Sequence, residues 1–260
     1  MPHPGKLFLI PTPLGPHPGN QVLPGHVIQI VHTLDTFFVE RIRQANSFLR
    51  WIKHPVPDFK CRFYELNKHT PGEDLIEMLS LLKNGVNAGI ITEAGCPGIA
   101  DPGSDLVRLA HESGIPVIPL VGPSSILLAV MASGMNGQAF AFHGYLPRPG
   151  HQRTERIRQL QNESAARQIT QVFMETPYRN NNLMSELIRE LPDETRLCAA
   201  SNLTLPDEQI ISCRVAEWKK KIFDLDHRPA IFLLMAAAAE TVADAKGKKK
   251  PAHKRKRAGK

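Results

Sequence analysis

The segment TEAGCPGIADPGSDL, residues 92–106, contains three glycines and two prolines in fifteen positions. It follows the apolar run AGII (88–91) and precedes VRLAHESG (107–114), so it connects a buried strand to a helix. Glycine lets the backbone approach a ligand closely, and proline stiffens a loop before any ligand arrives. The alternative is a purely structural connection between the strand and the helix, but such a connection requires fewer glycines and prolines. The segment therefore predicts a rigid backbone cradle at the carboxyl end of a strand, where open α/β sheets bind ligands.

Two further loops have a similar character. PTPLG (11–15) follows the first predicted strand, and LVGPSS (120–125) leads into the apolar helix SSILLAVMASG (124–134), which we expect to be packed on both sides. Ser124 or Ser125 is a candidate N-cap, and a helix start offers free amides. Capping explains one serine but not the Gly-Pro before the pair. If the three strands end on the same side, these loops line one cleft. The absence of GxxxxGK(S/T) and GxGxxG motifs disfavours a P-loop or a standard dinucleotide site.

Strand and helix signals alternate along the chain. We expect strands at 6–13, 36–40, 60–66, 87–92, 115–122, 139–146, 168–175, 195–203, 208–215 and 229–236. We expect helices at 26–34, 41–52, 71–85, 104–114, 124–134, 151–167 and 178–191. The alternation predicts an α/β protein with mostly parallel or mixed sheets. A boundary near 117–123 would separate an N-terminal α/β domain (1–120) from a C-terminal α/β domain (121–240), with two small sheets facing each other.

The net charge of +7 comes from the end of the chain. The last fifteen residues, KGKKKPAHKRKRAGK, hold nine of the 32 basic residues and no acid, which leaves 23 basic against 25 acidic residues elsewhere. We predict that 241–260 is a disordered basic tail. It serves either to keep the protein soluble or, with an RNA substrate, to strengthen RNA binding in a salt-dependent way.

Composition also excludes several classes of protein. No apolar run reaches transmembrane length and the N-terminus has no signal-peptide cleavage site, so we expect a cytoplasmic protein without membrane contact. Scattered cysteines favour free thiols over disulfides or a zinc site; they are Cys61, Cys96, Cys198 and Cys213. His111 and His143 each stand alone, so we expect no metal.

Several motifs together resemble a known family. ITEAGCPGIADPGSDLV (91–107), VGPSSILLAVMASG (121–134), FHGYLPR (142–148) and ETPYRNN (175–181) occur in the order found in the tetrapyrrole methylase superfamily. They look most like its branch that methylates a ribose 2'-hydroxyl in small-subunit ribosomal RNA, and the likeness extends from residue 6 to about 237. The resemblance implies S-adenosylmethionine as cofactor, a cleft for it between two α/β domains, and a homodimer.

The resemblance also implies where the cofactor binds. Carried over by position, the contacts are Pro13, Leu14, Gly95, Cys96, Gly98, Ile99, Ser124, Ser125, Met174, Ala200 and Pro229. Several of these would act through backbone atoms. An apolar cleft with backbone donors suits an adenine and a sulfonium, which agrees with the cradle inferred from the loops.

Two departures from the family lie where the methyl acceptor is expected. Glu40-Arg41-Ile42-Arg43 stands where the ribosomal branch has Glu-Asp-Thr-Arg, and the first loop, PLGPHPGNQVLPG (13–25), replaces a short Gly-Asn turn. The cofactor assignment is unaffected by these changes. The assignment of ribosomal RNA as the methyl acceptor is weakened by them.

The sequence offers three candidate general bases for a hydroxyl acceptor, which are Glu40, Glu93 and Asp101. Each has a structural alternative: Glu93 can accept loop amides, Asp101 can organise the turn before the next helix, and Glu40 can pair with Arg41 or Arg43. We therefore assign no catalytic residue from the sequence.

Two segments are candidates for acceptor binding. In RTERIRQLQ (153–161), the residues Arg153, Arg156 and Arg158 can contact phosphates, although the interspersed acids favour a solvated helix face. Tyr178 and Arg179 open a helix beside the expected cleft, and a tyrosine can stack on a base. The alternative for this pair is a helix turn packed at the domain interface.

The leading interpretation is an S-adenosylmethionine-dependent methyltransferase that acts on ribosomal RNA, with the basic tail favouring RNA. A second is methylation of a tetrapyrrole or other small molecule, which the near-neutral body favours. A third is a cofactor-binding protein without transferase activity, suggested by the altered segment VERIR (39–43).

Overall fold

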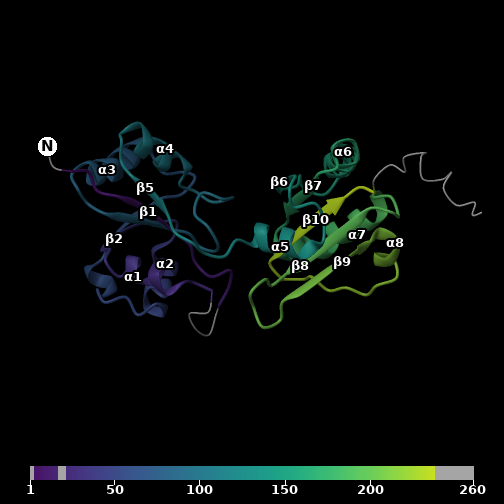
Figure 1. The fold of residues 1–260 in the computed structure, drawn as a ribbon, viewed down its shortest axis with the longest axis horizontal. Helices are drawn as coiled ribbons and strands as arrows, with labels where there is room; N and C mark the ends of the chain where they lie inside the picture. The colour runs from purple at the N-terminus through teal and green to yellow at the C-terminus, as the bar shows by residue number, and fades with distance from the viewer. Residues whose placement is uncertain (1–2, 17–21, 238–260) are drawn as a thin grey trace, which may run out of the picture.

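A computed structural model describes residues 3–16 and 22–237 (Figure 1). The predicted tail, 241–260, and the middle of the first loop lie outside the described residues. Figure 1 shows two sheets side by side along the long axis of the molecule, each with helices packed against it. The α/β prediction with two sheets is confirmed.

The first sheet has five strands in the order β3-β2-β4-β1-β5, and every pair is parallel. Its strands are β1 (Leu7–Ile10), β2 (Thr36–Val39), β3 (Arg62–Glu65), β4 (Ala88–Ile91) and β5 (Val117–Pro119). All residues of β2 and β4 are buried, as expected for strands covered on both faces. Because β4, β1 and β5 are parallel neighbours, the loops that follow them leave the same edge of the sheet.

Helices cover both faces of this sheet. They are α1 (Gly25–Val31), α2 (Ile42–Trp51), α3 (Gly72–Lys83) and α4 (Ser104–Glu112), with a 3₁₀ turn η1 (Asp58–Lys60) before β3. α1 and α2 pack on one face, against Ile10 and Phe37. α3 and α4 pack on the other, against Leu7 and Phe38. The alternation of side chains along each strand produces these two cores.

The second sheet has the order β6-β7-β10-β8-β9 and is mixed. Its strands are β6 (Phe140–Tyr145), β7 (Thr170–Met174), β8 (Arg196–Ser201), β9 (Gln209–Arg214) and β10 (Ala230–Met235). Only β6 and β7 are parallel; β7–β10, β10–β8 and β8–β9 are antiparallel. The prediction of mostly parallel or mixed sheets is therefore confirmed, with one parallel sheet and one mixed sheet in which a short turn joins β8 to β9 as an antiparallel hairpin.

The remaining helices surround the second sheet. They are α5 (Ser125–Ser133), α6 (His151–Arg167), α7 (Asn180–Glu190) and α8 (Val215–Trp218), with a 3₁₀ turn η2 (Pro177–Arg179) before α7. α6, α7 and α8 share one core with Phe173 and Phe232, and α5 packs on the opposite face with Ile231. No helix among residues 3–16 and 22–237 has the length and apolar character needed to cross a bilayer.

The prediction that α5 is packed on both sides is wrong. Ile126, Ala129 and Val130 face the sheet and are buried, whereas Leu127 is 52% exposed and Met131 is 77% exposed. A helix that is apolar all round thus leaves one apolar face uncovered in the single chain.

Candidate functional site

Three loops meet at the carboxyl edge of the first sheet. Thr12 and Gly95 exchange two backbone hydrogen bonds, from Thr12 N to Gly95 O at 2.9 Å and from Gly95 N to Thr12 O at 3.1 Å. The Cys96 thiol lies 3.4 Å from the carbonyl oxygen of Pro123 and donates to it. The loops after β1, β4 and β5 are therefore joined to one another, as expected if they line one cleft.

The glycine of the Gly-Pro before Ser124 has a steric explanation. A Cβ atom built on Gly122 would lie 2.3 Å from Cγ and 2.4 Å from Cβ of Pro11, so only glycine lets the third loop approach the first. The second loop also needs special backbone: its residues with positive φ are Gly95, Gly98, Ala100 and Gly103. The density of glycine in residues 92–106 is thus required by the path of the loop.

A cavity of about 280 Å³ lies at this meeting point, and its walls come from both halves of the chain. Nine of the predicted cofactor contacts line it: Leu14, Gly95, Cys96, Ile99, Ser124, Ser125, Met174, Ala200 and Pro229. Pro13 and Gly98 do not line it, and Gly98 faces a separate hollow beside α4 together with His111. A contact of Pro13 or Gly98 with the cofactor stays a prediction.

The two serines have different positions. Ser124 is the N-cap of α5, because its hydroxyl oxygen accepts from Leu127 N at 3.5 Å. Ser125 is the first residue of the helix. A capping side chain satisfies only one of the free amides of the first turn, so others have no partner within the helix, and Ser125 and Ile126 of this turn line the cavity.

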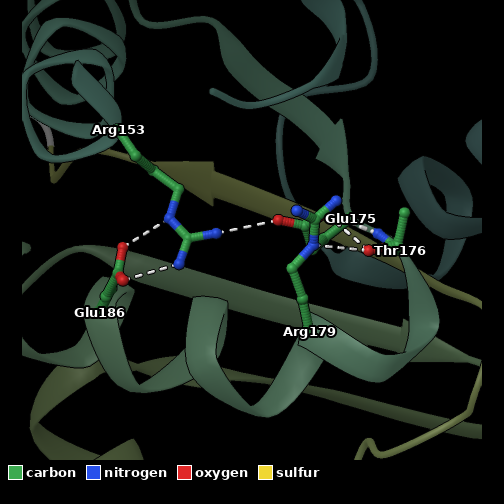
Figure 2. A network of polar contacts seen from close by, with 5 residues as sticks. All are labelled: Arg153, Glu175, Thr176, Arg179 and Glu186. Carbon is green, nitrogen blue, oxygen red and sulfur yellow. Dashed lines mark hydrogen bonds and ion pairs between the residues drawn. The ribbon is translucent and has the colours of Figure 1, made fainter. Parts of the chain in front are cut away.

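The second sheet contributes Glu175, which follows β7 and lines the cavity. Its carboxylate accepts hydrogen bonds from Arg153 Nη1 (2.9 Å), Thr176 N (2.7 Å) and Thr176 Oγ1 (3.1 Å), and Arg179 Nη2 lies 3.2 Å away (Figure 2). These donors occupy most of the acceptor capacity of the buried carboxylate, which leaves little of it for a hydrogen bond from a substrate.

The position of Arg153 differs from the one expected from the sequence. Its side chain is 0% exposed, and it donates to both oxygens of Glu186 at 2.6 Å as well as to Glu175. It therefore lies neither on a solvated face nor within reach of a phosphate. A buried guanidinium requires such partners, and both carboxylates come from later segments of the chain.

The other arginines and the histidine of this region do not line the cavity. Arg158 is exposed and pairs with Glu190, as the solvated-face interpretation expects. Arg156 lies 3.1 Å from Glu163 and donates to His143 Nδ1 at 3.1 Å. His143 is thus satisfied by hydrogen bonds, and the described part of the chain contains no group of three His, Cys, Asp or Glu residues suited to a metal ion.

The three candidate bases lie close together, but only Asp101 lines the cavity. Burial raises the pKa of Asp101, against the opposing effect of a hydrogen bond from Thr92. Burial also raises the pKa of Glu40, with further contributions from the charges of Glu93 and Asp101. Arg41 pairs with Glu93, at 3.2 Å between Nε and Oε1.

Some lining residues escaped the sequence analysis. Tyr145 ends β6, and Asn202, Leu203 and Leu205 lie in the turn between β8 and β9. Leu205 crosses to the first half, since a Cβ on Gly15 would lie 3.0 Å from Leu205 Cδ1. Tyr145 lies in the motif FHGYLPR (142–148), so it could have been predicted from the sequence. The lining residues of the turn could not be predicted in this way, because the position of the turn depends on the antiparallel pairing of β8 and β9.

The cavity walls define the kind of ligand they suit. Among the described residues, the lining contains no lysine or arginine, so nothing there balances a chain of phosphates. Apolar side chains, free amides and a polar rim suit an adenosine-like group with an uncharged or cationic extension. Fold and cavity together define a two-sheet α/β protein whose cavity suits a nucleoside-like ligand better than a nucleotide.

Comparison with known proteins makes the assignment specific. The family model for tetrapyrrole (corrin/porphyrin) methylases matches residues 21–219, and the chain belongs to this family. It is an S-adenosylmethionine-dependent methyltransferase, as the motif resemblance implied.

Individual relatives agree with the family. The ribosomal RNA small subunit methyltransferase I of Escherichia coli O157:H7 is 26% identical over 84% of this chain and 73% of its own. The protein of the same name from Bacillus subtilis (strain 168) is 30% identical over 82% of this chain and 68% of its own. The crystal structure of uroporphyrin-III C-methyl transferase from Thermus thermophilus complexed with S-adenyl homocysteine has a TM-score of 0.52 at 17% identity, covering 89% of this chain and 97% of that one. This last likeness is one of fold.

Proposed function

We propose that the protein transfers a methyl group from S-adenosylmethionine to a ribose 2'-hydroxyl of small-subunit ribosomal RNA. The observation that carries the proposal is the cavity, where three loops of the first half meet the second sheet and where the described lining residues include no lysine or arginine. The names of the relatives support ribosomal RNA as the acceptor.

The chain's own residues fit this cofactor. Main chain at 94–96 and the start of α5 would bind the polar groups of the donor, while Leu14, Ile99 and Met174 supply apolar contacts. The bound sulfonium supplies an activated methyl group, so the protein's main contribution is to hold donor and acceptor in line.

The test has two steps. Calorimetry with S-adenosylmethionine measures binding to the cavity, and transfer of labelled methyl to small-subunit ribosomal RNA measures the reaction. Mass spectrometry of the digested RNA then locates the methyl on ribose or base. Cofactor binding without transfer to any RNA would sink the proposal. Transfer to a tetrapyrrole instead would support the second candidate, which the near-neutral charge outside the basic tail favours.

We also propose that the protein acts as a homodimer. The uncovered apolar face of α5, formed by Leu127 and Met131, supports an interface with a second copy, together with Val121 just before the helix, which is also exposed. Burying such side chains against the same face of another copy removes apolar surface from water without any charged group to desolvate.

A further inference from the structure

An exposed aromatic residue lies next to the cavity. Tyr178 follows Pro177, which lines the cavity, and Tyr178 is 61% exposed. The guanidinium carbon of Arg179 lies 5.2 Å from the centre of its ring. The ring therefore has one face near a cation, at a distance typical of a cation–π contact, while much of its surface stays open.

Arg179 is itself fixed. Its Nε donates to Thr176 Oγ1 at 2.7 Å, and its Nη2 lies 3.2 Å from Glu175 Oε1. Thr176 Oγ1 in turn donates to the same carboxylate. The cation beside Tyr178 is thus tied to the wall of the cavity.

Figure 2 shows Glu175 between Arg179 and Arg153, with Glu186 on the far side of Arg153. Two cations and two anions balance in this network, and three of the four side chains come from segments after α6. Buried ion pairs add little net stability compared with apolar packing, because removing charges from water is costly. What the network provides is a fixed geometry for residues 175–179.

We propose that Tyr178 stacks on the base of the nucleotide to be methylated, and that Arg153 is a positioning residue that holds the Tyr178 ring in place through Glu175 and Arg179. This inference rests on the proposed function and narrows its substrate to an unpaired nucleotide. A base inside a double helix has both faces covered, whereas a base in a loop or bulge can stack on an aromatic side chain. Stacking would bring the ribose of that nucleotide toward the cavity.

The first test changes the ring. For full-length Tyr178→Ala we expect the KM for small-subunit ribosomal RNA to rise about tenfold, the size usual for losing one stacked base. The Kd for S-adenosylmethionine should stay as in wild type, since Tyr178 does not line the cavity. Tyr178→Phe keeps the ring and should restore most of the loss. An unchanged KM in Tyr178→Ala would overturn the inference.

The second test asks whether Arg153 acts through Tyr178. Arg153→Met should raise the RNA KM in the wild-type background and add no further increase in Tyr178→Ala, because the two changes break one chain of contacts. A purely structural role for Arg153 predicts the same added loss in both backgrounds, and that result would overturn the positioning role. Arg158→Met is the matched control: it removes an exposed ion pair between the same two helices, to Glu190, without touching Glu175.

A second variant covers the case in which Arg153→Met does not fold. Arg179→Met removes the partly exposed cation between Glu175 and Tyr178, and should show the same lack of additivity with Tyr178→Ala. The outcomes also separate this inference from the proposed function. Wild type that methylates no RNA refutes the function and the inference together, whereas normal transfer with an unchanged KM in Tyr178→Ala refutes the inference alone.

Discussion

Asp101 illustrates how a single side chain can lower stability at a ligand site. Burial raises the pKa of Asp101, so the folded protein binds its proton more tightly than the unfolded chain does. The folded state is therefore favoured below the ordinary pKa of 3.8, and loses that advantage as pH rises through the folded pKa. Above its ordinary pKa, the partly buried Asp101 carboxyl therefore lowers the stability of the folded protein.

We accordingly expect Asp101→Asn to raise the melting temperature at pH 7 and to have a smaller effect as pH falls toward 3.8. Asparagine can still accept the hydrogen bond from Thr92. Thermal unfolding across this pH range measures the effect, with Asp105→Asn on the exposed surface of α4 as the control. A larger loss of stability at pH 7 than at pH 4 would contradict the argument.

A substitution at Gly122 tests the close contact between the first and third loops. We expect Gly122→Ala to destabilise the protein by about 1–3 kcal/mol, because the new methyl group overlaps the ring of Pro11 and must push two loops apart. Binding of S-adenosylmethionine should weaken in parallel. Gly137→Ala is the control, since its Cβ would meet only Val130 Cγ1 at 3.7 Å. Equal effects of the two changes on melting and on Kd would rule out the proposed contact.

Among the elements, α5 combines two roles. Its first residues border the cavity, and its outward face carries Leu127 and Met131. If that face forms the dimer interface, each cavity lies within one helix length of the partner chain.

We expect Met131→Glu to convert the dimer to a monomer, because a carboxylate in an apolar interface is desolvated without a partner. Light scattering after size exclusion gives the mass directly. Ile76→Glu is the control, on the exposed side of α3 in the first half. A wild-type monomer, or a Met131→Glu dimer of unchanged mass at micromolar concentration, would exclude this interface.

Apart from the short helix α8, which was not predicted, the helices and strands of both halves could be predicted from the sequence to within a few residues. This was possible because apolar periodicity and the positions of Gly and Pro are local signals. The direction of β8, β9 and β10 could not be predicted, since strand pairing is decided by contacts between distant segments. Arg153 shows the same limit. Its charged neighbours suggest solvent, and its burial depends on Glu175 and Glu186, which lie 22 and 33 residues further along.

For the whole molecule, we infer that the boundary between two domains, 1–120 and 121–240, falls between β5 and α5. β5 pairs with β1 in the first sheet, whereas α5 packs on strands of the second. The predicted cofactor contacts of the first half come from loops that follow strands, whereas Met174, Ala200 and Pro229 in the second half were placed by the family resemblance alone. That the contacts from the two halves meet at one cavity could not be predicted, because this depends on how the two sheets are placed relative to each other.

A further prediction concerns the role of the basic end of the chain in RNA binding. We expect a chain truncated after Ala245 to bind RNA more weakly and with a flatter dependence on salt. The slope of log K against log salt should fall by about 0.7 for each phosphate that the tail no longer neutralises. RNA binding at several salt concentrations measures this, and cofactor affinity should not change. An identical slope in the full and shortened chains would leave the tail without a role in RNA binding.

The lining of the cavity comes from both halves of the chain, for example from Ala94 in the loop after β4 and from Ala230 in β10. A cofactor product bound there would contact both halves of the chain. If its release needs the two halves to separate slightly, we expect product release rather than methyl transfer to limit the rate of repeated turnover, which a burst of methylated RNA in the first turnover would reveal.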